Sequence, residues 1–280
     1  MTFAPFKSAT RRLNIAAQRA VRKVIGNGAL PHFLIIGAQK AGTTSLYDYL
    51  AQSPQIVPVV RKEAHHFDRY ELPSLDSYRT FFPSRVALER DGSITGEATP
   101  FYMFHPYAAE RISAAGLAPK LIAILRDPVA RAVSHHAHEQ RKGREEMSFA
   151  EAIACESERL RNTVDRVLDQ DHLRALREKS YVSRGLYTHQ LQRFETHFGR
   201  ENLLVLSLDS LAETPEAVVR RCCDFLGVAA PVDPSFPIRN RAKEQNDLTQ
   251  AREVLAGRFD QELAELQRYL PESEQWFHPR

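Results

Sequence analysis

The stretch from Phe33 to Tyr47, FLIIGAQKAGTTSLY, constrains the fold most, because an apolar run passes through two glycines and a lysine into three hydroxyl residues. This order is typical of a strand, a phosphate-binding turn and the first turn of a helix. A helix start presents unpaired backbone N–H groups and a partial positive charge, so it stabilises an anion. The alternative is an ordinary tight turn with an N-cap, which the same residue types also form.

The lysine of this stretch is displaced from the position it has in ATP- and GTP-binding loops. In the Walker A spacing, G-x-x-x-x-G-K-[ST], the lysine directly precedes a hydroxyl residue, whereas Lys40 here comes before Gly42, Thr43 and Thr44. A nucleotide-dependent kinase of the P-loop type would also need an acidic residue at a strand end to hold Mg²⁺. The pattern therefore favours a phosphate loop of another kind, with such a kinase as the first alternative.

Three apolar runs, 33–36, 121–125 and 203–208, predict strands of a mostly parallel sheet, and residues 55–60 predict a further short strand. Segments with helical periodicity separate them, which indicates βαβ units with right-handed crossovers. We expect one α/β domain over residues 29–280, with a central, mainly parallel sheet and helices on both faces. The predicted helices cover residues 43–51, 128–141, one or two helices within 148–179, 183–197, 215–226 and 248–270.

Residues 1–28 contain no acidic residue and alternate basic with apolar side chains over residues 7–25. They predict a basic amphipathic helix, which either lies on an anionic membrane surface or packs on the domain with a solvated face. A transit peptide is a third interpretation. The membrane interpretation also supplies a second alternative function, a non-catalytic membrane-associated adaptor.

Composition adds limits to these interpretations. The net charge of +3 is too small to indicate a nucleic-acid partner. No apolar run approaches the roughly 20 residues of a membrane span, and we expect a cytoplasmic protein. Cys155, Cys222 and Cys223 have no metal-binding spacing, so we expect free, at least partly buried thiols.

A second candidate anion site follows the apolar run 121–125. Arg126 comes at the carboxyl end of this predicted strand, where ligands of open α/β sheets bind, and Ser134 follows on the next helix. A guanidinium recognises phosphate through two parallel hydrogen bonds, and the serine hydroxyl adds a donor. The alternative for Arg126 is a salt bridge to Asp127. Two separate anion sites favour a ligand with two phosphate groups.

Four motifs follow one another along the chain: Gly37-Ala-Gln-Lys40-Ala-Gly42-Thr43-Thr44, Lys62-Glu63-Ala-His65-His66-Phe67, Gly96-Glu-Ala-Thr-Pro100 and Arg126-Asp-Pro. This ordered set resembles the sulfotransferases that use 3′-phosphoadenosine 5′-phosphosulfate (PAPS), in particular bacterial members and the heparan sulfate N- and 3-O-sulfotransferases. The resemblance spans residues 32–270. It implies a P-loop-like fold, related to that of nucleotide kinases.

The resemblance also implies how the donor is held. The 5′-phosphosulfate would lie on Lys40, Ala41, Gly42, Thr43, Thr44 and Ser45; the 3′-phosphate on Arg126 and Ser134; and the basic loop over that phosphate would be Arg239, Asn240 and Arg241. Lys and Arg neutralise the phosphates, so no metal is required. The product nucleotide would be 3′-phosphoadenosine 5′-phosphate (PAP).

Glu63 matches the family's general base, Lys40 would stabilise the leaving phosphate, and His65 would orient Glu63 or the acceptor, although an ordinary structural histidine is the alternative. A metal site at His65 and His66 is disfavoured because adjacent residues poorly suit one ion. The heparan sulfate enzymes carry a catalytic lysine where this chain has Ala98. Either Lys40 acts with fewer neighbouring cations, or Lys62 or an arginine takes the place of that second lysine.

Two further residues of the family's segment beside the cofactor, Arg184 and Tyr187, are candidates for contact with the site, with packing as the alternative. The acceptor stays open among a glycan, a glycolipid and a small natural product, and so does the choice between a hydroxyl and an amine.

Overall fold

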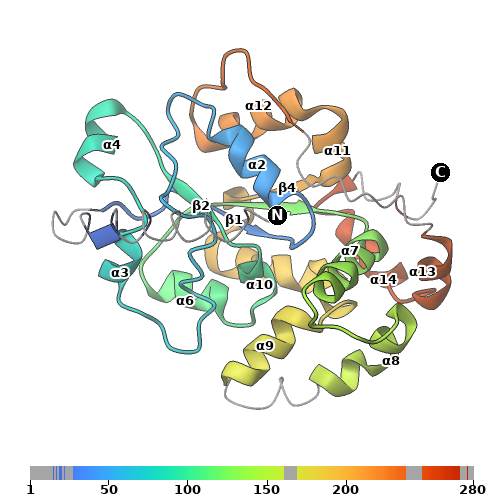
Figure 1. Ribbon diagram of the computed structural model, residues 1–280. Coiled ribbons are helices and arrows are strands. Elements are labelled where there is room, and N and C mark those ends of the chain that lie inside the picture. Colours follow the sequence, from blue (N-terminus) through green and yellow to red (C-terminus); the bar gives the residue numbers. More distant parts are fainter. Residues whose placement is uncertain are drawn as a thin grey trace, which may run out of the picture.

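Four parallel strands form the centre of the molecule (Figure 1). The computed structural model describes residues 28–160, 169–237 and 248–271, together with residues 15, 17, 19, 20, 22 and 276. The strands are β1 (Phe33–Gly37), β2 (Gly96–Ala98), β3 (Lys120–Leu125) and β4 (Leu203–Ser207), in the order β2-β1-β3-β4. Every neighbouring pair is parallel. The predicted α/β fold with a mainly parallel sheet is confirmed.

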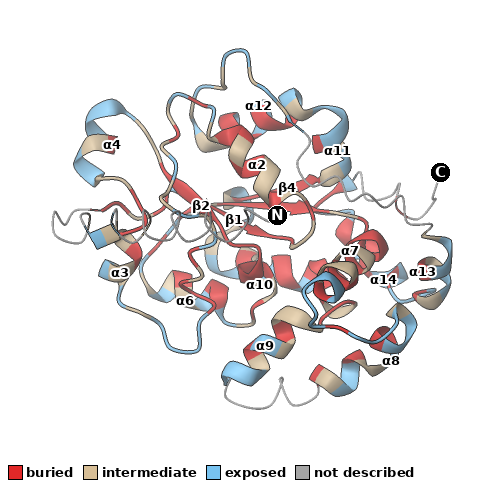
Figure 2. Cartoon of the chain, in the orientation of Figure 1, coloured by how far each residue is buried: buried red, intermediate tan, exposed pale blue. Residues whose placement is uncertain are grey.

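Helices cover both faces of this sheet, and every strand residue except the partly exposed Lys120 is buried (Figure 2). Side chains of β1 alternate between the two faces, so Leu34 and Ile36 belong to one apolar cluster and Phe33 and Ile35 to the other. Helices α2 (Thr43–Leu50) and α12 (Pro215–Leu226) cover one face, and α5 (Phe101–Phe104), α6 (Ala108–Ala114) and α10 (Tyr187–Phe198) lie on the other.

The remaining elements surround this core. They are α3 (Leu75–Arg79), α4 (Arg85–Asp91), α7 (Pro128–Arg141), α8 (Phe149–Leu160), α9 (Gln170–Glu178), the short 3₁₀ helices η2 (Ser183–Gly185) and η3 (Arg200–Asn202), α11 (Leu208–Glu213), α13 (Thr249–Val254) and α14 (Asp260–Leu266). Helix α7 has the predicted bounds, with Pro128 in its first turn and the Asp127 side chain accepting a hydrogen bond from the Ala130 N–H.

Three predicted elements were wrong. Residues 55–60 form no strand beyond a single bridge between Ile56 and Ile94, because Pro58 has no N–H to donate to a ladder. The predicted last helix, 248–270, is two helices, α13 and α14, and Gly257 between them takes a left-handed conformation with φ 72°. Leu208 begins α11 instead of ending β4. In addition, the sequence did not predict strand β2, which lies next to β1 in the sheet.

Part of the basic N-terminal segment packs on the domain. Arg19 donates to the Thr80 hydroxyl over 2.9 Å and lies over the Phe81 ring, and Arg22 donates to the Phe81 carbonyl over 2.8 Å. These are contacts that the packed interpretation expects. Most of residues 1–28 lie outside the described residues, and membrane contact stays a prediction.

Two other sequence expectations concern helices and thiols. Among the described helices, none combines the length and the apolar composition that a bilayer crossing requires. Cys222 and Cys223 are buried and Cys155 is partly buried, and all three are free thiols as expected.

Candidate active site

The carboxyl ends of three neighbouring strands bring the predicted site residues together. The loop with Lys40 follows β1, and Arg126 directly follows β3. Glu63 adjoins the end of β2, because its N–H donates to the carbonyl of Ala98 over 3.0 Å. Since β1 lies between β2 and β3, the three side chains occupy one edge of the sheet.

Residues 38–45, the phosphate loop, turn sharply between β1 and α2. Lys40 and Gly42 have left-handed φ angles of 71° and 87°. A Cβ at Gly42 would come within 2.7 Å of the Leu208 side chain, so both the conformation and the space require glycine there. No side chain caps α2, which leaves the first-turn N–H groups of Thr43, Thr44 and Ser45 available to an anion.

Ala41 of this loop serves the turn itself. It is fully buried, and its N–H donates to the Ala38 carbonyl over 3.2 Å. The Ala41 N–H therefore already has a partner inside the protein.

Lys40 stands among other cations and has no ion pair with any side chain in the described part of the chain. Burial lowers its pKa, followed by the nearby Arg141, Arg126 and Lys142, while Glu139 partly offsets them. A group of like charges around a half-buried lysine is unfavourable unless an anion completes it. The electrostatics of the loop therefore indicate an anionic ligand.

Arg126 does not form the alternative salt bridge to Asp127. Asp127 instead caps α7 and pairs with Arg252 at 2.5 Å. The Arg126 guanidinium turns toward the phosphate loop, where Nη1 donates to the Lys40 carbonyl over 3.4 Å, and burial lowers its pKa. Ser134 lies farther along α7 and is partly exposed, so both predicted residues of the second anion site have access to a ligand.

Residues 63–68, the Glu63 segment, hold a chain of alternating charges. The Glu63 side chain is half exposed, and its Oε2 lies 3.5 Å from His65 Nε2. His65 Nδ1 lies 2.6 Å from the fully buried Asp68 Oδ2, and Arg177 approaches the same oxygen at 3.4 Å. The structure thus supplies a partner, Asp68, that the sequence did not reveal.

These contacts set the protonation of the segment. Burial alone would lower the pKa of His65, but the hydrogen bond to Asp68 and the contact with Glu63 outweigh it and raise this pKa to about 9. The contact with His65 lowers the pKa of Glu63, against the effect of burial. Near neutral pH the segment therefore contains an imidazolium between two carboxylates, with one of them, Glu63, facing solvent.

A buried carboxylate, Glu97 of β2, holds the backbone of the Glu63 segment. It accepts hydrogen bonds from the Ala64 N–H at 2.9 Å and from the hydroxyls of Thr99, Tyr78 and Tyr102 at 2.7 to 2.9 Å. Burial raises its pKa. The only sequence signal of this role was an acidic residue inside the Gly96–Pro100 motif.

Three of the non-glycine residues with left-handed φ angles are Lys40, Glu63 and His65, at 71°, 56° and 50°. Such conformations are unfavourable for these residue types and cluster where surrounding structure fixes a functional geometry. The three residues predicted as catalytic are therefore also held in strained conformations.

Lys62 and His66 have other partners. The Lys62 ammonium pairs with Asp48 at 2.7 Å. Because its charge already has a partner, Lys62 is a poor replacement for a catalytic lysine at the position of Ala98. His66 is buried and stacked on Tyr78, and burial lowers its pKa to about 4. Within the part of the chain that the structure describes, no three His, Cys, Asp or Glu side chains gather as a metal site would need.

Tyr187 and Arg184 are both buried beside the site. The Tyr187 hydroxyl donates to the Arg126 carbonyl over 2.9 Å, and the Arg184 guanidinium donates to the Gln39 side chain. Tyr187 therefore supports the end of β3, and Arg184 supports the phosphate loop. The predicted basic loop, Arg239, Asn240 and Arg241, lies outside the described residues.

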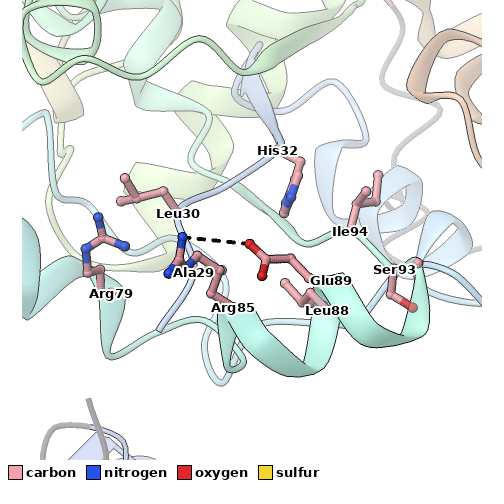
Figure 3. Close-up of a pocket in the computed structure, with 10 residues that line it drawn as sticks. Ala29, Leu30, His32, Arg79, Arg85, Leu88, Glu89, Ser93 and Ile94 are labelled. Atoms are coloured by element: carbon pink, nitrogen blue, oxygen red, sulfur yellow. Dashed lines mark ion pairs between the residues drawn. The ribbon is translucent and has the colours of Figure 1, made fainter. Parts of the chain in front are cut away.

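A cavity of about 450 Å³ lies at the other end of the sheet (Figure 3). His32 and Ile94, which precede β1 and β2, line it, and so does the exposed ion pair of Arg85 with Glu89 on α4. None of the predicted site residues lines this cavity. It is separate from the edge that carries Lys40, Glu63 and Arg126.

Comparison with known proteins gives one consistent family. Residues 30–248 match the family model described as "Sulfotransferase domain". The heparan sulfate glucosamine 3-O-sulfotransferase 3A1 of Mus musculus is 34% identical over 203 residues, which cover 72% of this chain and 47% of that protein. The bifunctional heparan sulfate N-deacetylase/N-sulfotransferase 3 of Homo sapiens is 32% identical over 211 residues, covering 71% of this chain and 22% of that protein.

A solved structure is similar over a larger share of its length. The sulfotransferase from Alicyclobacillus acidocaldarius has a TM-score of 0.65 and 34% identity, and the match covers 89% of this chain and all of that one. The chain spans about half the length of the 3-O-sulfotransferases that it matches.

Proposed function

Because the chain belongs to the sulfotransferase domain family, we propose that it transfers a sulfuryl group from PAPS to a hydroxyl or amine. The observation that carries the proposal is Lys40: it is unpaired within the described residues, surrounded by Arg126, Arg141 and Lys142, and next to the uncapped start of α2. PAPS carries a phosphate group on the 3′ oxygen of its ribose and a phosphosulfate group on the 5′ oxygen. The phosphate loop suits the 5′-phosphosulfate, and Arg126 with Ser134 suits the 3′-phosphate.

The reaction breaks the bond between sulfur and the bridging phosphate oxygen and forms a bond between sulfur and the acceptor oxygen or nitrogen. Negative charge develops on the leaving 5′-phosphate, and Lys40 with the first-turn N–H groups of α2 stabilises it. The acceptor proton passes to Glu63, whose lowered pKa keeps it ionised and ready to accept. His65 and Asp68 hold the Glu63 carboxylate in place.

The site itself offers little support for the kinase alternative. Asp127 is the acidic residue at the end of β3, where such an enzyme would hold Mg²⁺, but its side chain caps α7 and pairs with Arg252. A purely adaptor role leaves the strained Glu63 and its charged partners without a use.

The acceptor is proposed more broadly than the donor. The curated relatives are named for heparan sulfate, which favours a glycan, with a glycolipid or small natural product as further candidates. Ala98 stands where the heparan sulfate enzymes have lysine, so a second cation near the reacting oxygen would have to come from Arg126 or from α7.

The test uses the full chain and ³⁵S-labelled PAPS with heparan sulfate, a glycolipid extract and simple phenols as separate acceptors. We expect label in at least one acceptor fraction, together with binding of PAP measured by calorimetry. A parallel incubation with γ-³²P-labelled ATP tests the kinase alternative. Phosphate transfer without sulfuryl transfer, or no binding of PAP, would overturn the proposal.

A further inference from the structure

Arg184 connects the phosphate loop with the Glu63 segment through a series of contacts, although no contact with either proposed ligand is assigned to it. It belongs to η2 and is buried, with 3% of its surface exposed. One nitrogen, Nη1, donates to the side-chain oxygen of Gln39, the residue directly before Lys40. The other, Nη2, donates to the carbonyls of Leu176 and Arg177 at 2.7 and 3.1 Å, at the end of α9.

The end of α9 leads in turn to the Glu63 segment. Arg177 Nη2 donates to the Asp68 carbonyl over 2.8 Å and lies 3.4 Å from its carboxylate, and Asp68 contacts His65. The guanidinium groups of Arg177 and Arg184 both lie over the Phe101 ring, at 4.8 and 4.9 Å. A continuous set of contacts therefore runs from Gln39 through Arg184 and Arg177 to Asp68.

A buried arginine held only by neutral oxygens needs a reason. No carboxylate pairs with Arg184 within the described residues, and its Nε has no hydrogen-bond partner there. Burial lowers the pKa of Arg184 well below its usual value, and the nearby Arg131 adds to this effect. Taking a charge out of water without a counter-charge is costly, so an apolar side chain would stabilise the fold more easily. A planar guanidinium, however, reaches acceptors on two separate elements at once, which an apolar residue or a lysine does not.

We propose that Arg184 is a positioning residue, which fixes the phosphate loop relative to the Glu63 segment and so sets the approach of the acceptor to the sulfuryl group. The inference rests on the proposed function, because it assigns the donor to one element and the base to the other. Each ligand site keeps its own contacts when Arg184 is altered. What changes is the alignment between them, and a displacement of about 1 Å costs on the order of a hundredfold in rate.

Two variants interrupt the connection at different points. Arg184→Lys removes the fork that spans Gln39 and the α9 carbonyls, and Gln39→Met removes only the acceptor on the loop while keeping the side chain's length. We expect each to lower kcat by on the order of ten- to a hundredfold, with the Kd for PAP and the acceptor KM changed by less than about threefold. The double variant should be no slower than Arg184→Lys alone, since both cut one connection.

Arg193→Lys is the matched control. Arg193 also donates from Nη2 to two backbone carbonyls, those of Met103 and Phe104, at 3.0 and 3.2 Å, and its Nε is also buried without a partner. It touches neither the phosphate loop nor α9 in any described contact, so we expect its kcat to stay near that of the wild type even where its Tm falls.

The measurements are kcat and KM with ³⁵S-labelled PAPS and the acceptor found in the screen, the Kd of PAP, and the Tm of each variant. If Arg184→Lys does not fold, Gln39→Met still gives the result. A wild type without sulfuryl transfer overturns the proposed function and, with it, this inference. An active wild type whose Arg184→Lys and Gln39→Met variants keep kcat, or lose it additively, overturns the inference alone.

Discussion

The phosphate loop and the Glu63 segment lie at the same edge of the sheet but treat charge in opposite ways. In the phosphate loop, Lys40 and the neighbouring Arg126, Arg141 and Lys142 form no ion pair in the described structure, and the start of α2 has no side-chain cap. In the Glu63 segment, every charge has a partner: Glu63 and Asp68 flank His65, and Arg177 approaches Asp68.

This difference matches the two tasks of a group-transfer site. A loop that binds an anion gains most when its positive charge is unpaired until the ligand arrives. A base that removes a proton needs a fixed position and a defined protonation state, and neighbouring charges provide both. Ligand binding should therefore depend on the phosphate loop and proton transfer on the Glu63 segment, and the following variants test whether the two separate in this way.

Glu63→Gln should have the largest effect. It keeps the side chain's size but removes the proton acceptor, so we expect kcat to fall by roughly a hundred- to ten-thousandfold. The Kd for PAP should stay within about threefold of the wild type, because no donor contact is proposed for Glu63. Turnover and calorimetric binding are measured on the same preparation. Glu89→Gln, an exposed carboxylate on α4, is the control, and near-normal turnover of Glu63→Gln would remove this residue from the mechanism.

Arg126→Ala should have the next largest effect, and on binding first. Hydrogen bonds between charged groups contribute roughly 1.5–3 kcal/mol, so the Kd for PAP should rise by about ten- to a hundredfold. Adenosine 5′-phosphosulfate lacks the 3′-phosphate, and its binding should change little. Arg85→Ala, an exposed arginine of α4, serves as the control. An equal loss for both nucleotides would contradict the assignment of Arg126 to the 3′-phosphate.

The sequence was enough to bring the candidate site residues together but did not reveal the residues that support them. Apolar runs identified β1, β3 and β4, and residues after β1 and β3 necessarily meet at one edge because parallel strands share their carboxyl ends. Lys40 and Arg126 were found in this way, and Glu63 through the family resemblance. β2 was missed as a strand because it has three residues and one of them is the buried Glu97.

The supporting residues leave no local pattern. Asp68 follows His65 by three positions with nothing to mark it as a hydrogen-bond partner, and the contact of Arg184 with Gln39 joins residues 145 positions apart. Such contacts depend on how α9 and η2 pack against the loop. Tertiary packing of this kind is not encoded in periodicity or spacing.

Asp68→Asn tests whether the charges of the Glu63 segment act together. In the wild type, the raised pKa of about 9 means that His65 is charged at neutral pH. Because the folded-state pKa lies above the unfolded value, the resulting stabilisation is complete below about pH 6.5 and is lost as the pH rises through about 9. Activity should show the same alkaline limit if charged His65 holds Glu63.

In Asp68→Asn the pKa of His65 should fall and the alkaline limit of kcat should move to lower pH, with a loss on the order of tenfold at pH 8. NMR titration of the His65 ring and the pH profile of kcat give the two readouts. Asp76→Asn, an exposed carboxylate of α3, is the control. A profile that keeps its limit near pH 9 would show that His65 does not govern Glu63.

Salt should give the smallest effect and separates the two regions without any substitution. Exposed and half-exposed charges are screened beyond about 10 Å at 0.1 M salt, whereas a buried pair is screened much less. Raising NaCl from about 0.05 to 0.3 M should therefore weaken PAP binding by roughly three- to tenfold, because the phosphate loop presents unpaired cations to solvent. The titration midpoint of His65, which contacts the fully buried Asp68 at 2.6 Å, should stay nearly constant over the same range. Calorimetry and NMR titration measure the two quantities in identical buffers. If salt changes the affinity for PAP and the titration midpoint of His65 equally, the charges of the Glu63 segment are as open to solvent as those of the phosphate loop. The two regions would then not differ in whether their charges are paired and shielded.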